Sequence, residues 1–365
     1  MTKLAIKLFK CIHQRKKIKH RKSQFNFQSN EYFKLSRFEL LPDEILIEIF
    51  EYLPLTDLYS AFVNLNFRLN FLLRQSQIGF YLYQNESVNG NLLRSLFYFQ
   101  KQLRFLHIDH NPLINLQIFS NLKSLTIYLP TKDQLLQINN RILPNLNRLS
   151  LGMIHRNDRN LILKSLFGEN KLLKLKYCYF YEIDFNETIH SYEYSYNITK
   201  LSIKHVEMKD FLCLLSLLPN VCQFDVSITD LCLKSFQNLT KFSHRNLRIL
   251  KMEFVDKLSG LNHLSDLISF VPFVEQLTLV LINLVQLKDY LILENIFLNH
   301  CLQLKQFICS IDYDCQLSSN QLIHKFNQFK TRDHSYQTIQ IIPCQIHDDQ
   351  CLRKIFLNKI LTPIY

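Results

Sequence analysis

The sequence predicts an α/β protein: a small all-α unit near the amino terminus, followed by a curved solenoid, or horseshoe, that ends in a C-terminal capping helix. Three observations support this fold class. Residues 41–53, LPDEILIEIFEYL, are apolar on most of their surface if they form a helix. After residue 100, a short apolar pattern recurs at intervals of 19 to 32 residues. Residues 348–361 then carry apolar side chains at helical spacing.

The segment 41–53 has more apolar surface than one buried face requires. Its only polar stripe consists of Glu44, Glu48 and Glu51, which lie on one side of a helix. A helix packed on a single core needs one apolar stripe, and this segment has more than that. The excess surface must therefore be buried by a second body, either another part of the chain or a partner protein.

A second helix is expected to open at Leu55, with Thr56 or Asp57 as its capping residue. Its apolar residues recur at helical spacing, and another apolar segment follows. The sequence thus predicts two or three short helices within about forty residues, a unit that buries little surface when it is alone.

These residues resemble the F-box family motif, LPxEILxxIFxYLPxxDLxxA. The resemblance implies docking to a Skp-family adaptor in a cullin–RING ubiquitin ligase. One departure is Arg68, which stands where many F-boxes have a tryptophan. By the same resemblance, six residues would contact the adaptor: Leu41, Pro42, Ile45, Ile49, Phe50 and Leu53.

The recurring pattern is apolar-x-x-apolar-x-apolar. Its last three positions alternate as in a strand, and helical segments are expected at 210–218, 266–270 and 294–301. Proline precedes several strands, where it ends the helix before it. One strand and one helix per repeat, stacked side by side, form a solenoid. The ten units begin at Leu103, Leu122, Leu146, Leu172, Ile198, Val221, Leu247, Val274, Leu304 and Tyr336.

This pattern resembles a leucine-rich repeat array over residues 101–344. Such repeats often carry Asn or Cys three residues after the last apolar strand position, and only Asn111 and Cys344 stand there, so the array is degenerate. A mixed α/β domain with chance periodicity is the alternative. An F-box followed by leucine-rich repeats is a familiar combination, and each resemblance therefore supports the other.

Five parts follow from these patterns. Residues 1–37 form a basic tail, residues 38–76 the F-box, and residues 77–100 a connecting segment. Residues 101–344 form the repeats, and residues 345–365 form a C-terminal cap.

The leucine-rich repeat resemblance also indicates where a target protein would bind. In such arrays the strand positions beside the second apolar residue face the concave surface, and here five of them are basic and one is acidic. We expect this surface to bind an acidic or phosphorylated segment of a target protein, with ordinary solvated surface as the alternative. The basic residues are Arg148, Lys174, Lys176, Lys200 and Lys251.

The composition disfavours several classes of enzyme. The chain has only five glycines and lacks the GxGxxG and GxxxxGK[ST] motifs of nucleotide-binding folds. It also lacks GxSxG and HExxH. The ten cysteines include no CxxC pair, and Cys344, His347 and Cys351 offer three metal ligands without a fourth. We therefore predict no catalytic residue, no cofactor, no small-molecule substrate and no metal site, and we expect mostly buried, reduced thiols.

Nearly all of the net charge lies in the tail. Residues 1–37 carry a net charge of +10 and the rest of the chain +2, which argues against a large nucleic-acid-binding face. The run RKKIKHRK at 15–22 is typical of a nuclear import signal, a solvated tail or an anionic-surface contact, and a mitochondrial presequence is a further alternative. Without a signal sequence or an apolar stretch of membrane length, we expect a cytoplasmic or nuclear protein with no membrane contact.

Together these observations predict a non-enzymatic substrate-recognition subunit of an F-box-type ubiquitin ligase. The F-box would bind the adaptor and cullin complex, and the repeats would bind the target protein. The alternative is a leucine-rich repeat scaffold that binds partners without a ligase.

Overall fold

A computed structural model describes residues 38–82, 90–110, 114–169, 171–183, 192–230, 243–254, 268–282, 303–314, 336–343 and 352–360. The chain divides into two compact units, residues 1–126 and residues 127–365. The basic tail, the helix expected at 294–301 and the trio of Cys344, His347 and Cys351 lie outside the described residues.

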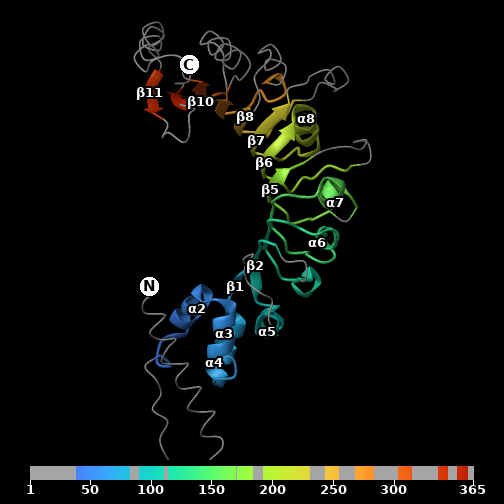
Figure 1. Cartoon of the computed structure of the whole chain (residues 1–365), viewed down its shortest axis with the longest axis vertical. Coiled ribbons are helices and arrows are strands. Elements are labelled where there is room, and N and C mark those ends of the chain that lie inside the picture. The colour runs from blue at the N-terminus through green and yellow to red at the C-terminus, as the bar shows by residue number, and fades with distance from the viewer. Residues whose placement is uncertain are drawn as a thin grey trace, which may run out of the picture. The chain divides into compact units, whose positions relative to one another are not determined.

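The described part of the first unit begins with three helices: α2 (Asp43–Tyr52), α3 (Leu55–Phe62) and α4 (Phe67–Gln75) (Figure 1). The first two begin directly after Pro42 and Pro54, whose fixed φ angles suit the start of a helix.

The cap predicted for the second helix is wrong. Pro54 is the N-cap residue of α3, so Thr56 and Asp57 lie inside its first turn. The cap of α4 is a side chain: Asn66 Oδ1 accepts a hydrogen bond of 2.8 Å from the Leu69 N–H.

The rest of the first unit alternates strands and helices. β1 (Ile78–Leu82) runs parallel to β2 (Leu103–Ile108), and α5 (Gly90–Phe99) lies between them in the sequence. A short 3-10 helix, η1 (Leu116–Ile118), precedes β3 (Ser124–Ile127).

The sequence predicted that helices α2–α4 form a separate all-α unit, and the structure shows that they do not. Helices α2 and α3 both contact β1, and α3 packs against α5, with the Tyr59 and Tyr98 ring centroids 5.8 Å apart. The predicted fold class is wrong on this point, because the apolar surfaces of these helices are partly covered by strand and helix from the same compact unit.

In the second unit, the strands β4 to β10 are hydrogen-bonded in chain order, and β12 and then β11 follow β10. Among its described residues, the helices are α6 (Lys132–Gln137), η2 (Arg156–Asp158), α7 (Arg159–Phe167) and α8 (Met208–Leu217). Its strands are β4 (Arg148–Leu151), β5 (Tyr177–Glu182), β6 (Lys200–Glu207), β7 (Gln223–Asp230), β8 (Ile249–Phe254), β9 (Gln276–Ile282), β10 (Gln306–Asp314), β11 (Tyr336–Pro343) and β12 (Leu352–Ile360).

The predicted repeat solenoid with a capping helix is also wrong. The structure shows an α/β arrangement: β1 and β2 are parallel in the first unit, and β4 to β10 are parallel in the second, in a sheet that does not close. Residues 352–360, which were expected to form the capping helix, are instead strand β12. This strand runs antiparallel to both β10 and β11, with Leu352 opposite Asp314 and Ile355 opposite Ile341.

One face of the second unit's sheet carries the core. Leu149, Leu151, Phe180 and Phe224 are buried, and helix α8 covers this face, with the Phe211 and Phe224 ring centroids 5.0 Å apart. Side chains alternate along a strand, so the residues between these core positions point to the opposite side. We call that opposite side of β4–β8 the open face.

Three asparagine side chains each donate a hydrogen bond to a carbonyl of the preceding repeat. Each asparagine stands just before the first apolar residue of its own repeat, and we call the three an asparagine ladder. In the first unit, Asn121 Nδ2 donates to the Lys101 carbonyl at 3.0 Å. In the second unit, Asn220 Nδ2 donates to the Tyr196 carbonyl at 2.8 Å, and Asn246 Nδ2 donates to the Pro219 carbonyl at 2.9 Å. Leucine-rich repeats often carry asparagine after the strand, where this chain has one only at position 111, whereas these three side chains lie before the strand.

Candidate functional site

The outward side of α2 carries the first candidate surface. Pro42 and Ile45 are exposed, Ile45 by 42%, and Ile49 and Leu53 are half-buried. Their spacings of three and four place these four residues in one row along the helix. We call this row the α2 stripe. Leu41, the fifth of the residues expected to contact an adaptor, is half-buried at the start of the helix.

Phe50 lies on the other side of α2. Its side chain has no exposed surface, and its ring centroid is 5.0 Å from that of Phe62 on α3. Leu46, one turn earlier, is also fully buried. Phe50 therefore supports the helix from inside, and it offers no surface to a partner in this arrangement.

Residues just before α2 and on α4 expose further apolar surface in the same unit. Phe67 and Phe71, one turn apart on α4, are 86% and 50% exposed, and Leu40 just before α2 is 67% exposed. Large apolar side chains gathered on short helices are typical of a protein-binding surface. The sequence did not lead us to assign any of these three to a binding surface, although the spacing of four between Phe67 and Phe71 indicates one side of a helix.

Arg68 fixes the start of α2 to α4. Its guanidinium donates to Asp43 Oδ1 from Nε at 2.9 Å and from Nη2 at 2.5 Å. The same group also donates to the Leu41 carbonyl at 2.6 Å and to the Glu39 carbonyl. The residue that departs from the F-box motif thus joins the two helices through polar contacts.

The second candidate surface depends on the strand register of the fourth repeat. The structure pairs Arg148 with Tyr177 and Leu149 with Cys178, so the apolar triplet of this repeat is Leu175-Cys178-Phe180. The predicted triplet, which began at Leu172, is wrong by three residues.

This correction changes which side chains occupy the open face. Tyr177 and Tyr179 occupy the positions predicted for Lys174 and Lys176, which precede β5. Lys174 is exposed and donates to Asn145 Oδ1 at 2.7 Å, and Lys176 is exposed just before the strand.

Two of the predicted basic residues meet at Tyr177. Arg148 on β4 lies opposite Tyr177 in the sheet, and Lys200 on β6 lies opposite it from the other side. The Arg148 Cζ is 5.2 Å from the Tyr177 ring centroid, and the Lys200 Nζ is 5.8 Å from it. These are cation–π distances, and they hold both cations beside one aromatic ring.

A similar group lies four residues further along β5. The Lys204 Nζ is 5.4 Å from the Tyr181 ring centroid, and the His205 ring packs edge-on against Tyr181 at 4.9 Å. Together, Arg148, Tyr177, Lys200, Tyr181 and Lys204 form what we call the cation–tyrosine strip of the open face.

The fifth predicted basic residue, Lys251 on β8, is not part of this strip. Its Nζ lies 3.3 Å from Asp225 Oδ2 on β7, so its charge has a carboxylate partner. The five predicted residues therefore separate into a converging pair, Arg148 and Lys200, and three that lie elsewhere.

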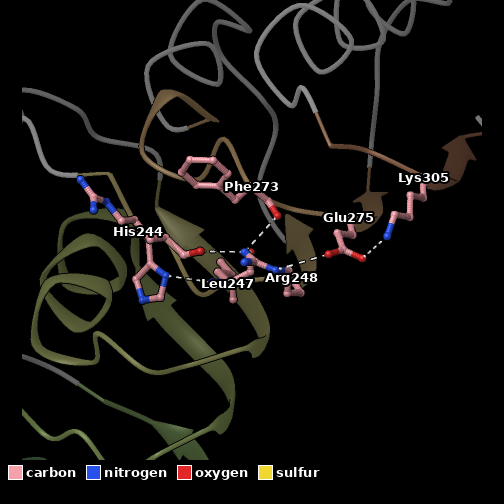
Figure 2. Close-up of polar contacts among 7 residues, drawn as sticks. His244, Leu247, Arg248, Phe273, Glu275 and Lys305 are labelled. Carbon is pink, nitrogen blue, oxygen red and sulfur yellow. Dashed lines mark hydrogen bonds and ion pairs between the residues drawn. The ribbon is translucent and has the colours of Figure 1, made fainter. Parts of the chain in front are cut away.

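A polar network crosses the starts of β8, β9 and β10 (Figure 2). Arg248 Nε is 3.4 Å from Glu275 Oε1, and Lys305 Nζ is 2.8 Å from Glu275 Oε2. The hydrogen bond from Lys305 and the charges of both cations hold the pKa of Glu275 below its usual range. Since each member has a partner inside the chain, this network joins strands and offers no unpaired charge.

His244 lies buried at the other end of the network in Figure 2. Its Nδ1 accepts from the Leu247 N–H at 3.1 Å, so Nε2 carries the proton and donates to the Leu218 carbonyl at 2.8 Å. Burial lowers the pKa of His244, an effect that the Leu218 contact partly offsets. The neutral ring thus has a structural role.

Metal ligands and thiols are the remaining chemical groups of note among the described residues. They contain no cluster of three or more His, Cys, Asp or Glu residues that could hold a metal ion. Burial raises the pKa of the Cys213 thiol to about 11 and that of the Cys178 thiol further still, so neither is a ready nucleophile at neutral pH. No described helix combines the length and apolar character that a membrane span needs.

No protein-family model matches the sequence, and no curated protein matches it significantly.

Proposed function

We propose that this chain is the substrate-recognition subunit of an F-box-type cullin–RING ubiquitin ligase. Helices α2 and α3 would dock a Skp-family adaptor, and the open face of the second unit would bind a target protein. The chain itself would make and break no bonds, and it would raise the concentration of the target near the ubiquitin donor.

One observation carries the adaptor half of this proposal. The α2 stripe keeps exposed apolar surface after the chain has covered Leu46 and Phe50 on the other side of the helix. A helix with apolar residues on two sides needs two partners, and the described part of the chain supplies only one. Leu40, Phe67 and Phe71 of the same unit are further exposed apolar side chains that an adaptor would cover.

Co-purification of the full chain with a Skp-family adaptor tests this proposal. Ile45→Asp places a charge in the middle of the α2 stripe, where the side chain is already exposed, and the fold should tolerate it. We expect this variant to lose adaptor capture, because burying an unpaired carboxylate in an apolar interface costs several kcal/mol, on the order of 2 or more.

Phe97→Asp is the matched control. Phe97 on α5 is an exposed aromatic residue of the same unit and lies outside the α2 stripe. This variant should capture the adaptor like the parent chain. Failure of the parent chain to capture any Skp-family adaptor would overturn the ligase proposal and favour a protein-interaction scaffold without a ligase.

A further inference from the structure

The cation–tyrosine strip holds positive charge that the described chain does not neutralise. Arg148, Lys200 and Lys204 form no ion pair with a described carboxylate. The carboxylates closest to them in the strand register already have cationic partners. Glu182 accepts from Arg159 at 2.5 Å, and Asp225 contacts Lys251 at 3.3 Å.

The strip holds its cations at two separate positions. At Tyr177, a guanidinium and an ammonium flank one ring, and their remaining donors are free to contact an anion. At Tyr181, Lys204 supplies a second cation. Four residues separate the two tyrosines, which corresponds to about 13 Å along a strand.

We propose that this strip binds an extended acidic peptide whose phosphate or carboxylate groups are four residues apart. An extended peptide rises about 3.3 Å per residue, so side chains four residues apart match the spacing of the two positions and point to the same side. This inference rests on the proposed function, because it identifies the chemistry of the target segment.

The aromatic geometry favours a peptide over a single-stranded nucleic acid. Bases bind such proteins by stacking on open aromatic faces. The ring of Tyr177 is flanked by cations from β4 and from β6, the two strands on either side of β5. Cations therefore lie beside this ring from two strands, and their donors can contact phosphate or carboxylate oxygens at the surface. Tyr179, between the two positions, is 39% exposed, so base stacking is an outcome that the test must distinguish.

Fluorescence anisotropy with the full chain tests this inference. The probe is a labelled nine-residue peptide with two phosphoserines four residues apart, compared with the same peptide carrying two glutamates and with one whose phosphoserines are adjacent. We expect binding of the first two, with the phosphorylated form tighter, and about tenfold weaker binding of the adjacent form because it reaches one position only.

The variants locate the binding. Arg148→Gln combined with Lys200→Gln should weaken binding by about tenfold or more, because charge-assisted hydrogen bonds are lost. Lys251→Gln, which removes a cation already paired with Asp225, should leave binding within about twofold. Binding that is equal in both variants, or absent at about 1 mM peptide, would overturn the inference.

Two further arms separate the alternatives. A labelled uridine oligonucleotide that binds as tightly as the phosphopeptide and competes with it would also overturn the inference, in favour of nucleic acid. Adaptor capture is measured on the same preparations. If the chain captures the adaptor but binds no peptide, this inference alone is contradicted. If it binds the peptide but captures no adaptor, the proposed function alone is contradicted.

Discussion

Arg68 on α4 contacts Asp43, the first residue of α2, through two nitrogens of its guanidinium at 2.5 and 2.9 Å. The same side chain also reaches the carbonyls of Glu39 and Leu41. The arginine that departs from the F-box motif thus positions the segment that carries the proposed adaptor contacts. An aromatic residue would have to hold these helices by packing instead.

Replacing Arg68 should loosen this junction. Arg68→Met keeps much of the aliphatic length and removes all four hydrogen bonds, and we expect a loss of about 0.5–1.5 kcal/mol in the free energy of unfolding. The value is modest because both side chains of the Arg68–Asp43 pair are about half exposed to solvent. Urea unfolding measures it, and Arg74→Met, an exposed arginine in the last turn of the same helix, is the control. If both variants are equally stable, Arg68 does not stabilise the contact between α4 and the start of α2.

Gly152 should tolerate no side chain. A Cβ at this position would lie 2.9 Å from the Cα and carbonyl carbon of Tyr128 and closer still to its carbonyl oxygen. Backbone atoms cannot rotate away, so Gly152→Ala should destabilise the chain by about 1–3 kcal/mol in urea unfolding. Gly90→Ala, where a Cβ meets nothing within 4 Å, should be neutral or slightly stabilising. If both variants unfold at the same urea concentration, the close contact between Gly152 and the Tyr128 backbone is contradicted.

Burial of His244 predicts a pH dependence of stability. The folded state lowers the pKa of this ring, so the unfolded chain, with a value near 6.5, takes up a proton first as the pH falls. The stabilisation is therefore complete above about pH 6.5 and decreases as the pH falls below that value, by at most about 1.4 kcal/mol per pH unit.

Unfolding free energies between about pH 7 and pH 5 test this prediction. His244→Gln removes the titrating ring, so its stability should depend less steeply on pH in that range. His155→Gln, at an exposed histidine in the same unit, should keep the slope of the parent chain. If the stability of His244→Gln depends on pH as steeply as that of the parent chain, protonation of His244 is not the cause of the pH dependence.

The buried thiols should resist alkylation while the chain is folded. Only the thiolate reacts, and burial together with the charge of Asp210 raises the pKa of Cys213 to about 11. At about pH 8, we expect Cys178 and Cys213 to react with iodoacetamide at least about a hundredfold more slowly than in urea. The half-exposed Cys222 should be labelled earlier, as peptide mass spectrometry can show. Equal labelling rates would contradict the burial of the first two.

The sequence predicted two or three short helices near residues 41–75 and the strand periodicity, because apolar spacing directly reflects which side chains are buried. It could not decide the register of the fourth repeat. Leu172-Leu175-Tyr177 and Leu175-Cys178-Phe180 both satisfy the same spacing, and only the pairing with β4 distinguishes them. The cation–tyrosine strip depends on that distinction.

The carboxyl-terminal strand was missed for a similar reason. Leu352, Phe356 and Ile360 are spaced by four, and a spacing of four fits one side of a helix as well as one side of a strand. Pairing with β10 and β11, which are distant in the sequence, selects the strand. Likewise, a helix that is apolar on several sides does not reveal that Phe50 faces inward and Ile45 outward, because that choice depends on the contacts of Phe50 with α3.

The most direct measurement is a calorimetric titration of the full chain with a purified Skp-family adaptor. The account predicts saturable one-to-one binding that Ile45→Asp weakens by about thirtyfold or more and that Phe97→Asp leaves unchanged. Undetectable binding by the parent chain, or equal affinity of the parent and Ile45→Asp chains, would contradict it.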